Sequence, residues 1–293
     1  MKPLLFLFGL FLIIDCAVAS PDAAVKLYPA HGLVQQIAAN HRSVTIHHQS
    51  IPGYMMEMTM DFTVANTNDL AGISTGDEID FTLAVGDTES WVTNLQLVAH
   101  HVTGVTNNTF VFHSDSLELK PGDLLPDGTL RTETGSIIHL SDFRGQAVAF
   151  TFFFTRCPLP DFCPRMNRNF GESRQLLLSN PNAPTNWEFL SISFDPDFDK
   201  PEVLANYAGL YRGDNARHWL FAAASTSTLT NLAPRLDLMV LRQGANISHN
   251  LRTVVLNPQG RIARQFDGNS WTPQELADAL LSAARATAPA ASP

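Results

Sequence analysis

Short runs of alternating apolar and polar residues, separated by polar turns, fill the first third of the chain after its opening segment. Five such runs predict β-strands at residues 32–37, 43–48, 58–65, 78–85 and 91–98. Turn-forming pairs, Gly76-Asp77 and Gly86-Asp87, flank the fourth of these strands. Because an open sheet this short would leave its edges unpaired, we expect a small five-stranded OB-like β-barrel over residues 28–102.

The second half of the chain alternates apolar strands with periodic helical segments. Residues 147–154 form an unbroken apolar run, which is typical of a strand buried on both faces. Further strands are expected at 188–194, 217–221 and 253–257, and helices at 164–178, 200–211 and 273–284. This order predicts an α/β domain over residues 120–286, reached through a turn-rich linker at 103–119. The low-complexity tail, residues 287–293, need not fold.

The first residues have the form of an export signal. Lys2 precedes an apolar run over residues 4–14, and Ala17-Val18-Ala19 resembles a signal-peptidase site. The run is shorter than the roughly 18 residues that span a bilayer. We therefore expect residues 1–19 to be a signal peptide, and the mature protein to lie in the periplasm or cell envelope without a membrane span. A retained anchor is the alternative.

The net charge argues against a nucleic-acid partner, and the cysteine content leaves one pair of thiols in the exported chain. The net charge is −9 at pH 7 and no basic run offers phosphate contacts, so we expect no nucleic-acid partner. Of the three cysteines, Cys16 falls within the signal, which leaves Cys157 and Cys163 in the exported chain. Exported thiols oxidise unless they are maintained, so a thiol-reductant partner is possible.

A cluster of methionines marks the first candidate metal site. Four of the seven methionines fall within residues 55–60, shortly after the pair His47-His48. Alternate residues of a strand share a face, so Met58 and Met60 would point the same way. Two thioethers with an imidazole from the neighbouring strand suit a soft ion such as Cu(I) or Ag(I). The alternative is that these methionines fill gaps in the core as adaptable hydrophobic side chains.

The same stretch resembles the copper-binding protein of the Cus efflux system, through His47-His48 and the later run Glu57-Met58-Thr59-Met60. The resemblance implies that His48, Met58 and Met60 hold Cu(I). That family places a tryptophan over the metal, whereas this chain has Met55 two residues before Glu57. Met55 would then be either a third thioether ligand or a lid.

Two cysteines mark the second candidate site. Cys157 and Cys163 lie between the predicted buried strand and a predicted helix, with Pro164 suited to the first helical position. The helix N-terminus and the nearby arginines favour a thiolate at Cys163, which would make it the better metal ligand and attacking thiol. A structural disulfide between the two cysteines is the alternative.

The surroundings of these cysteines resemble the SCO copper-chaperone family, through the run Phe154-Thr155-Arg156-Cys157-Pro158 and segments at residues 120–123, 140–145 and 193–204. The resemblance implies that the α/β domain is thioredoxin-like. It also implies that Cys157, Cys163 and His249 bind one copper ion for insertion into cytochrome oxidase. The spacing departs from the family, because five residues separate the two cysteines here and three separate them there.

Together these patterns predict an exported copper chaperone that delivers copper for cytochrome c oxidase assembly. Its partner would be a copper-accepting protein, such as an oxidase subunit, or a copper efflux component. Two alternatives stay open: a thiol-disulfide oxidoreductase with Cys157 and Cys163 as its redox pair, and a copper buffering or resistance protein. The fusion also suggests an internal relay, since a linker raises the effective concentration of one site at the other.

Overall fold

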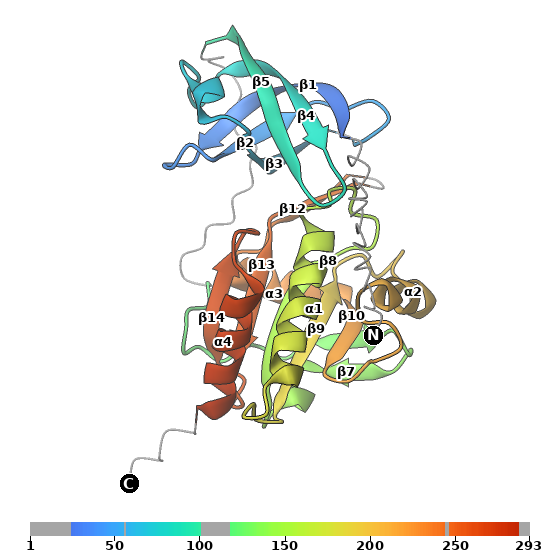
Figure 1. The fold of residues 1–293 in the computed structure, drawn as a ribbon. Coiled ribbons are helices and arrows are strands. Elements are labelled where there is room, and N and C mark those ends of the chain that lie inside the picture. Colours follow the sequence, from blue (N-terminus) through green and yellow to red (C-terminus); the bar gives the residue numbers. More distant parts are fainter. Residues whose placement is uncertain (1–24, 56, 101–117, 244–245, 287–293) are drawn as a thin grey trace, which may run out of the picture.

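Two domains, each with its own β-sheet, make up the described part of the chain (Figure 1). The computed structural model describes residues 25–55, 57–100, 118–243 and 246–286. The predicted signal peptide, nearly all of the predicted linker and the predicted tail lie outside these residues. Within the described ranges, no helix is both long enough and apolar enough to cross a membrane.

The N-terminal domain is a five-stranded antiparallel sheet with the strand order β3-β2-β1-β4-β5. Its strands are β1 (Lys26–Ile37), β2 (Ser43–His48), β3 (Met58–Thr63), β4 (Glu78–Val85) and β5 (Ser90–Ala99). The five predicted strands are confirmed. The first strand begins at Lys26 rather than Gly32, because its first half pairs with β4 despite the Pro29 that interrupts the sequence pattern.

The sheet of the N-terminal domain is not closed into a barrel, although the five-stranded fold class is confirmed. Among the described residues, the two edges of the sheet are joined by one isolated parallel bridge, between Val64, which follows β3, and Val92 of β5. The chain then turns into the short helix η1 (Thr67–Leu70), whose N-cap Asn66 accepts a hydrogen bond from the Asn68 amide. The chain is thus helical from Thr67, three residues after the bridge.

Gly32 allows β2 to pass close to β1 beside the histidine pair. A Cβ at this position would lie 2.6 Å from Ile46 Cγ2, 2.7 Å from the His47 carbonyl oxygen and 2.9 Å from His48 Cα. Only a residue without a Cβ fits such an approach. The position of His48 therefore depends on the glycine in the neighbouring strand.

The C-terminal domain is built on a seven-stranded mixed sheet with the order β14-β13-β8-β9-β10-β6-β7. Its strands are β6 (Thr129–Thr132), β7 (Ile137–His139), β8 (Ala147–Phe153), β9 (Trp187–Ser193), β10 (Trp219–Ala224), β13 (Arg252–Leu256) and β14 (Ile262–Asp267). Strands β8, β9 and β10 are parallel, and every residue of β8 is buried, as the apolar run predicted.

Helices cover the sheet of the C-terminal domain. They are α1 (Cys163–Ser179), α2 (Pro201–Arg212), α3 (Thr226–Leu232) and α4 (Pro273–Arg285), with short turns η2 (Leu140–Phe143) and η3 (Pro234–Leu236). Helices α1 and α4 lie side by side across one face of the sheet (Figure 1). The three predicted helices correspond to α1, α2 and α4, and the alternating strands and helices confirm the predicted α/β class.

A small hairpin extends from the C-terminal domain toward the N-terminal domain. Strands β11 (Val240–Gln243) and β12 (Asn246–His249) pair with each other outside the large sheet. Strand β12 contacts β3 of the N-terminal domain (Figure 1). The hairpin thus places residue 249 at the junction of the domains.

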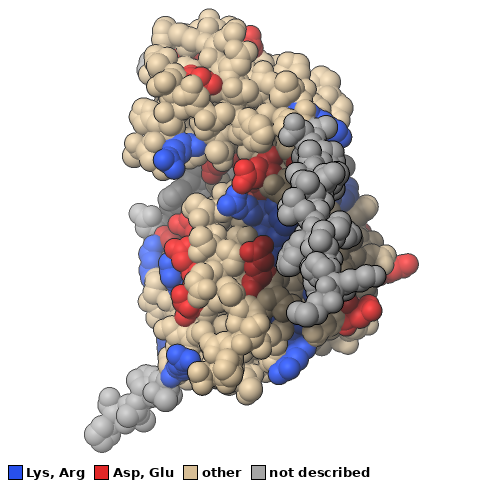
Figure 2. Space-filling view, in the orientation of Figure 1, with Lys and Arg blue, Asp and Glu red and all other residues tan. Residues whose placement is uncertain are grey.

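Charged side chains are mixed in sign on the face that Figure 2 draws. Lysine and arginine lie among aspartate and glutamate there, mostly over the C-terminal domain. Interspersed charges of this kind favour solubility rather than attraction of one highly charged partner.

Candidate metal site

The loop that carries the cysteines is fixed firmly at its start. Thr155 follows β8 and donates hydrogen bonds from its amide and hydroxyl to the Asp199 carboxylate. Arg156 donates to Asp195 at 2.6 Å and lies over the ring of Phe198. These contacts set the direction in which the chain enters the cysteine loop.

Cys157, Cys163 and His249 come together although the third residue is far away in the sequence. Their two sulfur atoms and a ring nitrogen all lie within 4.8 Å of one another, and both cysteines are free thiols. Cys163 opens α1 and is fully buried, whereas Cys157 is partly exposed. The cluster gathers the three residues that the sequence predicted as copper ligands.

His249 is held in one tautomer and one orientation. Its Nδ1 atom is 2.7 Å from the carbonyl oxygen of Asn250, and because a carbonyl only accepts, Nδ1 carries the proton. The Nε2 atom then faces Cys163 Sγ at 3.6 Å. The rings of Phe154 and Phe194 pack against the imidazole, with centroids 5.7 Å and 4.6 Å away. An imidazole held in this way directs Nε2 toward the cysteines and is suited to bind a metal.

The surroundings of the two thiols shift their pKa values in opposite directions. Burial opposes ionisation of Cys157, but hydrogen bonds with Cys163 and His249 outweigh it and hold the pKa of Cys157 well below its usual value. Burial, together with the hydrogen bond and charge of Cys157, raises the pKa of Cys163 well above its usual value. The prediction of a thiolate at Cys163 is therefore wrong, because the dipole of α1 does not overcome burial beside a second thiolate.

The N-terminal domain gathers a second set of soft donors. His48 on β2 lies directly opposite Met58 on β3, and Ile46 lies opposite Met60. These side chains share the inner face of the sheet, where His48 and Met60 are buried and Met58 is partly exposed. The structure thus brings together the three residues that the sequence predicted for this site.

His48 repeats the arrangement of His249. Its Nδ1 atom is 2.7 Å from the carbonyl oxygen of the next residue, Gln49, which places the proton on Nδ1. The buried Nε2 atom has no hydrogen-bond partner among the described residues. Burial lowers the pKa of His48, so its ring is neutral at pH 7. An unpaired buried nitrogen costs stability, and a bound metal ion would satisfy it.

The neighbouring His47 does not belong to this site. Its ring nitrogens each lie 3.0 Å from an oxygen, one from Thr59 and one from Glu57, on the outer face of the sheet. Successive residues of a strand point to opposite faces, so only one histidine of the pair can face the core.

A cavity of about 150 Å³ lies between the two domains and is lined by residues of both candidate sites. Met55, Met58 and Met60 contribute from the N-terminal domain, and Cys157, Phe162 and His249 from the C-terminal domain. Met55 is 7% exposed and lines this cavity, at the place where the sequence suggested a ligand or lid. The sequence contained no signal that the two sites would face each other.

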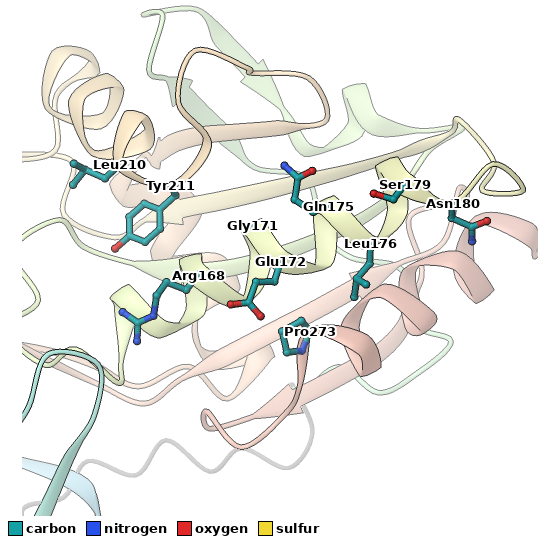
Figure 3. A pocket seen from close by; sticks show the side chains of 10 residues that line it. All are labelled: Arg168, Gly171, Glu172, Gln175, Leu176, Ser179, Asn180, Leu210, Tyr211 and Pro273. Carbon is teal, nitrogen blue, oxygen red and sulfur yellow. The ribbon is translucent and has the colours of Figure 1, made fainter. Parts of the chain in front are cut away.

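A larger groove of about 720 Å³ lies elsewhere, along α1 and α2 (Figure 3). Arg168 and Glu172 border it from α1, and Leu210 and Tyr211 border it from α2 (Figure 3). The described residues that line this groove include no cysteine, histidine or methionine. Its donors do not suit a soft metal ion, in contrast to the interdomain cavity.

The two domains match two different family models. Residues 27–97 match the model described as "Copper binding periplasmic protein CusF", and residues 120–285 match the SCO1/SenC model. These matches confirm both resemblances that the sequence indicated, and they support copper as the metal, as predicted.

Individual relatives match the C-terminal half. "Protein SCO2 homolog, mitochondrial" of Homo sapiens is 25% identical over 146 residues, 48% of this chain and about half (52%) of the relative's length. The SCO1 protein homolog of Bacillus subtilis is 23% identical over 154 residues, 50% of this chain and 75% of the relative. A SCO1/SenC family lipoprotein from Bacillus anthracis shares the fold, with a TM-score of 0.51 and 19% identity over 57% of this chain and 99% of its own. The SCO1/SenC model matches more than half of the residues of this chain. The chain therefore belongs to the SCO1/SenC family.

Proposed function

We propose that this protein is an exported copper chaperone that binds Cu(I) through Cys157, Cys163 and His249. The observation that supports this function most strongly is the convergence of two sulfurs and an imidazole nitrogen within 4.8 Å. Thiolate and imidazole are ligands that favour copper, and the cluster contains no carboxylate that would favour a hard cation.

We propose that His48, Met58 and Met60 form a second Cu(I) site. Thioethers are neutral and soft, so they bind Cu(I) in preference to Cu(II). The unpaired, buried Nε2 of His48 supports this role, because a purely structural histidine would normally have both ring nitrogens bonded.

Copper loading at the cysteine site would begin at Cys157. Its lowered pKa favours the thiolate, and Cys163 loses its proton when the metal ion replaces it. The acceptor would receive the ion by exchanging its own soft ligands for these residues. We propose an oxidase copper subunit as that acceptor, since the chain is a SCO1/SenC member with an export-type signal, and a copper efflux component as the alternative.

Thiol-disulfide exchange is the second candidate function, and the divergent pKa values of the two thiols favour it. A partly exposed, low-pKa Cys157 suits an attacking thiol, and a buried Cys163 suits a resolving thiol. However, Cys157 lines the cavity between the domains, where the N-terminal domain would hinder a protein substrate. A metal ion needs far less room, so the position of Cys157 favours copper loading, whereas delivery to a protein acceptor would require the two domains to separate.

The test is an anaerobic Cu(I) titration of the reduced full chain. The variants are Cys157→Ser/Cys163→Ser and Met58→Ile/Met60→Ile, with Met239→Ile as a control at an exposed methionine outside both sites. We expect two equivalents for the wild type and the control, and one equivalent for each double variant. Failure of the cysteines to bind copper, with rapid disulfide exchange at Cys157, would support the oxidoreductase instead.

A further inference from the structure

We propose that the loop at residues 158–161 is a docking element that holds the N-terminal domain over the cysteines. Cu(I) then passes directly between the His48, Met58, Met60 set and the Cys157, Cys163, His249 set within the interdomain cavity. This inference rests on the proposed copper function and adds the route of the ion and the contacts that form it.

Three polar contacts join the cysteine loop to the N-terminal domain. The hydroxyl of Tyr54 donates to the Pro158 carbonyl at 3.1 Å. The Ser90 hydroxyl donates to the Asp161 carboxylate at 2.6 Å, and both of these residues are about 5% exposed or less. Arg168 of α1 completes the set by donating to the carbonyl oxygens of Thr88 and Pro160. The loop therefore contacts the N-terminal domain at both of its ends.

The contact between Ser90 and Asp161 indicates a specific interface rather than a chance approach. A buried carboxylate without a partner is costly, so docking supplies a hydrogen bond that separated domains would have to replace with water. Asp161 is also fixed from its own domain, because Asn269 donates to its backbone carbonyl at 2.9 Å. Tyr54 is held by its stacking on Tyr28, with ring centroids 4.3 Å apart. Asp161 and Tyr54 are thus each held in place by contacts within their own domain.

The docked loop and the β11–β12 hairpin border the same cavity from two sides. Leu159 of the loop and Ile247 of β12 are each 3% exposed, and both line the cavity. Strand β12 also contacts β3, which carries Met58 and Met60. Apolar walls of this kind keep water from competing for the ion while its ligands change.

The transfer is a ligand exchange and leaves copper as Cu(I). Bonds form from copper to the Cys157 and Cys163 sulfurs and to His249 Nε2, while the thioether bonds to Met58 and Met60 and the bond to His48 break. The thiol proton of Cys163 passes to water, and no electron is transferred. Anionic thiolates hold Cu(I) more strongly than neutral thioethers, so the direction is from the N-terminal to the C-terminal set.

The test compares full-chain variants at the docking contacts. Ser90→Glu places a second carboxylate against Asp161, and Ser136→Glu is its control in the exposed turn between β6 and β7. Tyr54→Phe removes only a hydroxyl from the interface, and Tyr211→Phe is its control on α2. Small-angle X-ray scattering measures domain separation, and transfer of Cu(I) to bathocuproine disulfonate measures access to the ion.

We expect Ser90→Glu to increase the radius of gyration and to accelerate chelator capture about tenfold, as loss of one hydrogen bond to a carboxylate predicts. Tyr54→Phe should accelerate capture severalfold, and both controls should match the wild type. Equal capture rates in separated and docked proteins would overturn the inference, as would a wild type already as extended as Ser90→Glu. Either result leaves the proposed function intact if two equivalents of Cu(I) still bind, whereas loss of copper binding in the wild type contradicts the function itself.

Discussion

Replacing Gly32 with alanine tests whether the packing of β1 against β2 sets the position of His48. The new Cβ would lie 2.6 to 2.9 Å from three atoms of β2, whereas ordinary van der Waals contact begins near 3.4 Å. Two of these atoms belong to the backbone, so rotation of a side chain cannot relieve the clash. Strand β2 must move by several tenths of an ångström, and overpacking of this kind costs about 1–3 kcal/mol.

The assay combines urea unfolding with Cu(I) titration against a competing chelator. We expect the free energy of unfolding of Gly32→Ala to fall by about 1–3 kcal/mol. Copper affinity at the His48, Met58, Met60 set should fall about tenfold, because ligands need placement within roughly 0.5 Å. Gly86→Ala is the matched control, since its nearest neighbour lies at 3.4 Å. Wild-type stability and wild-type copper affinity in Gly32→Ala would refute the reasoning.

Three further predictions concern the C-terminal domain. The pH of half-maximal alkylation of Cys157 by iodoacetamide should lie below the ordinary thiol value of about 8.5, and should rise in His249→Ala because His249 helps to lower the pKa of Cys157. Burial raises the pKa of Glu188 to about 8, so the folded state binds the extra proton and its stability should decline as pH rises from about 4.5 toward 8. Chemical denaturation across that range should show the decline in the wild type and a flatter profile in Glu188→Gln. Arg212→Leu leaves the buried Glu133 without its ion pair and should lower the melting temperature, at a cost of about 3–5 kcal/mol. Unchanged melting of Arg212→Leu would show that Glu133 finds another partner.

Most regular elements were predictable because their sequence patterns are long and match their burial. The apolar run of β8 and the periodic segment of α1 are examples. Shorter elements were missed: β6 has four residues and β7 has three, too few to establish a period. Helix α3 was missed because serine and threonine dominate its sequence, and these residues favour caps and turns over helix interiors.

The members of each candidate site could be proposed from the sequence, whereas their electrostatics could not. The register of β2 and β3 follows from alternation, so the shared face of His48, Met58 and Met60 was accessible to prediction. The protonation order of the cysteines depends on the contacts of Cys157 with Cys163 and His249, which no local pattern contains. Their ligand roles remain predictions for the titration to test.

The sequence could not show that the two sites face each other across the interdomain cavity. It depends on contacts between residues 71 and 104 positions apart, Ser90 with Asp161 and Tyr54 with Pro158. Serine, tyrosine and proline at such separations form no recognisable motif. The two additional residues between the cysteines were evident in the sequence, but their use in docking emerges only from the three-dimensional arrangement.

X-ray absorption at the copper K-edge tests copper binding at the cysteine site most directly. The sample is the reduced full chain loaded anaerobically with one equivalent of Cu(I), alongside His249→Ala and His48→Ala. We predict two sulfur neighbours and one nitrogen neighbour in the wild type, with the nitrogen lost in His249→Ala and retained in His48→Ala. A nitrogen neighbour that persists in His249→Ala, or a first shell without sulfur, would contradict copper binding by Cys157, Cys163 and His249.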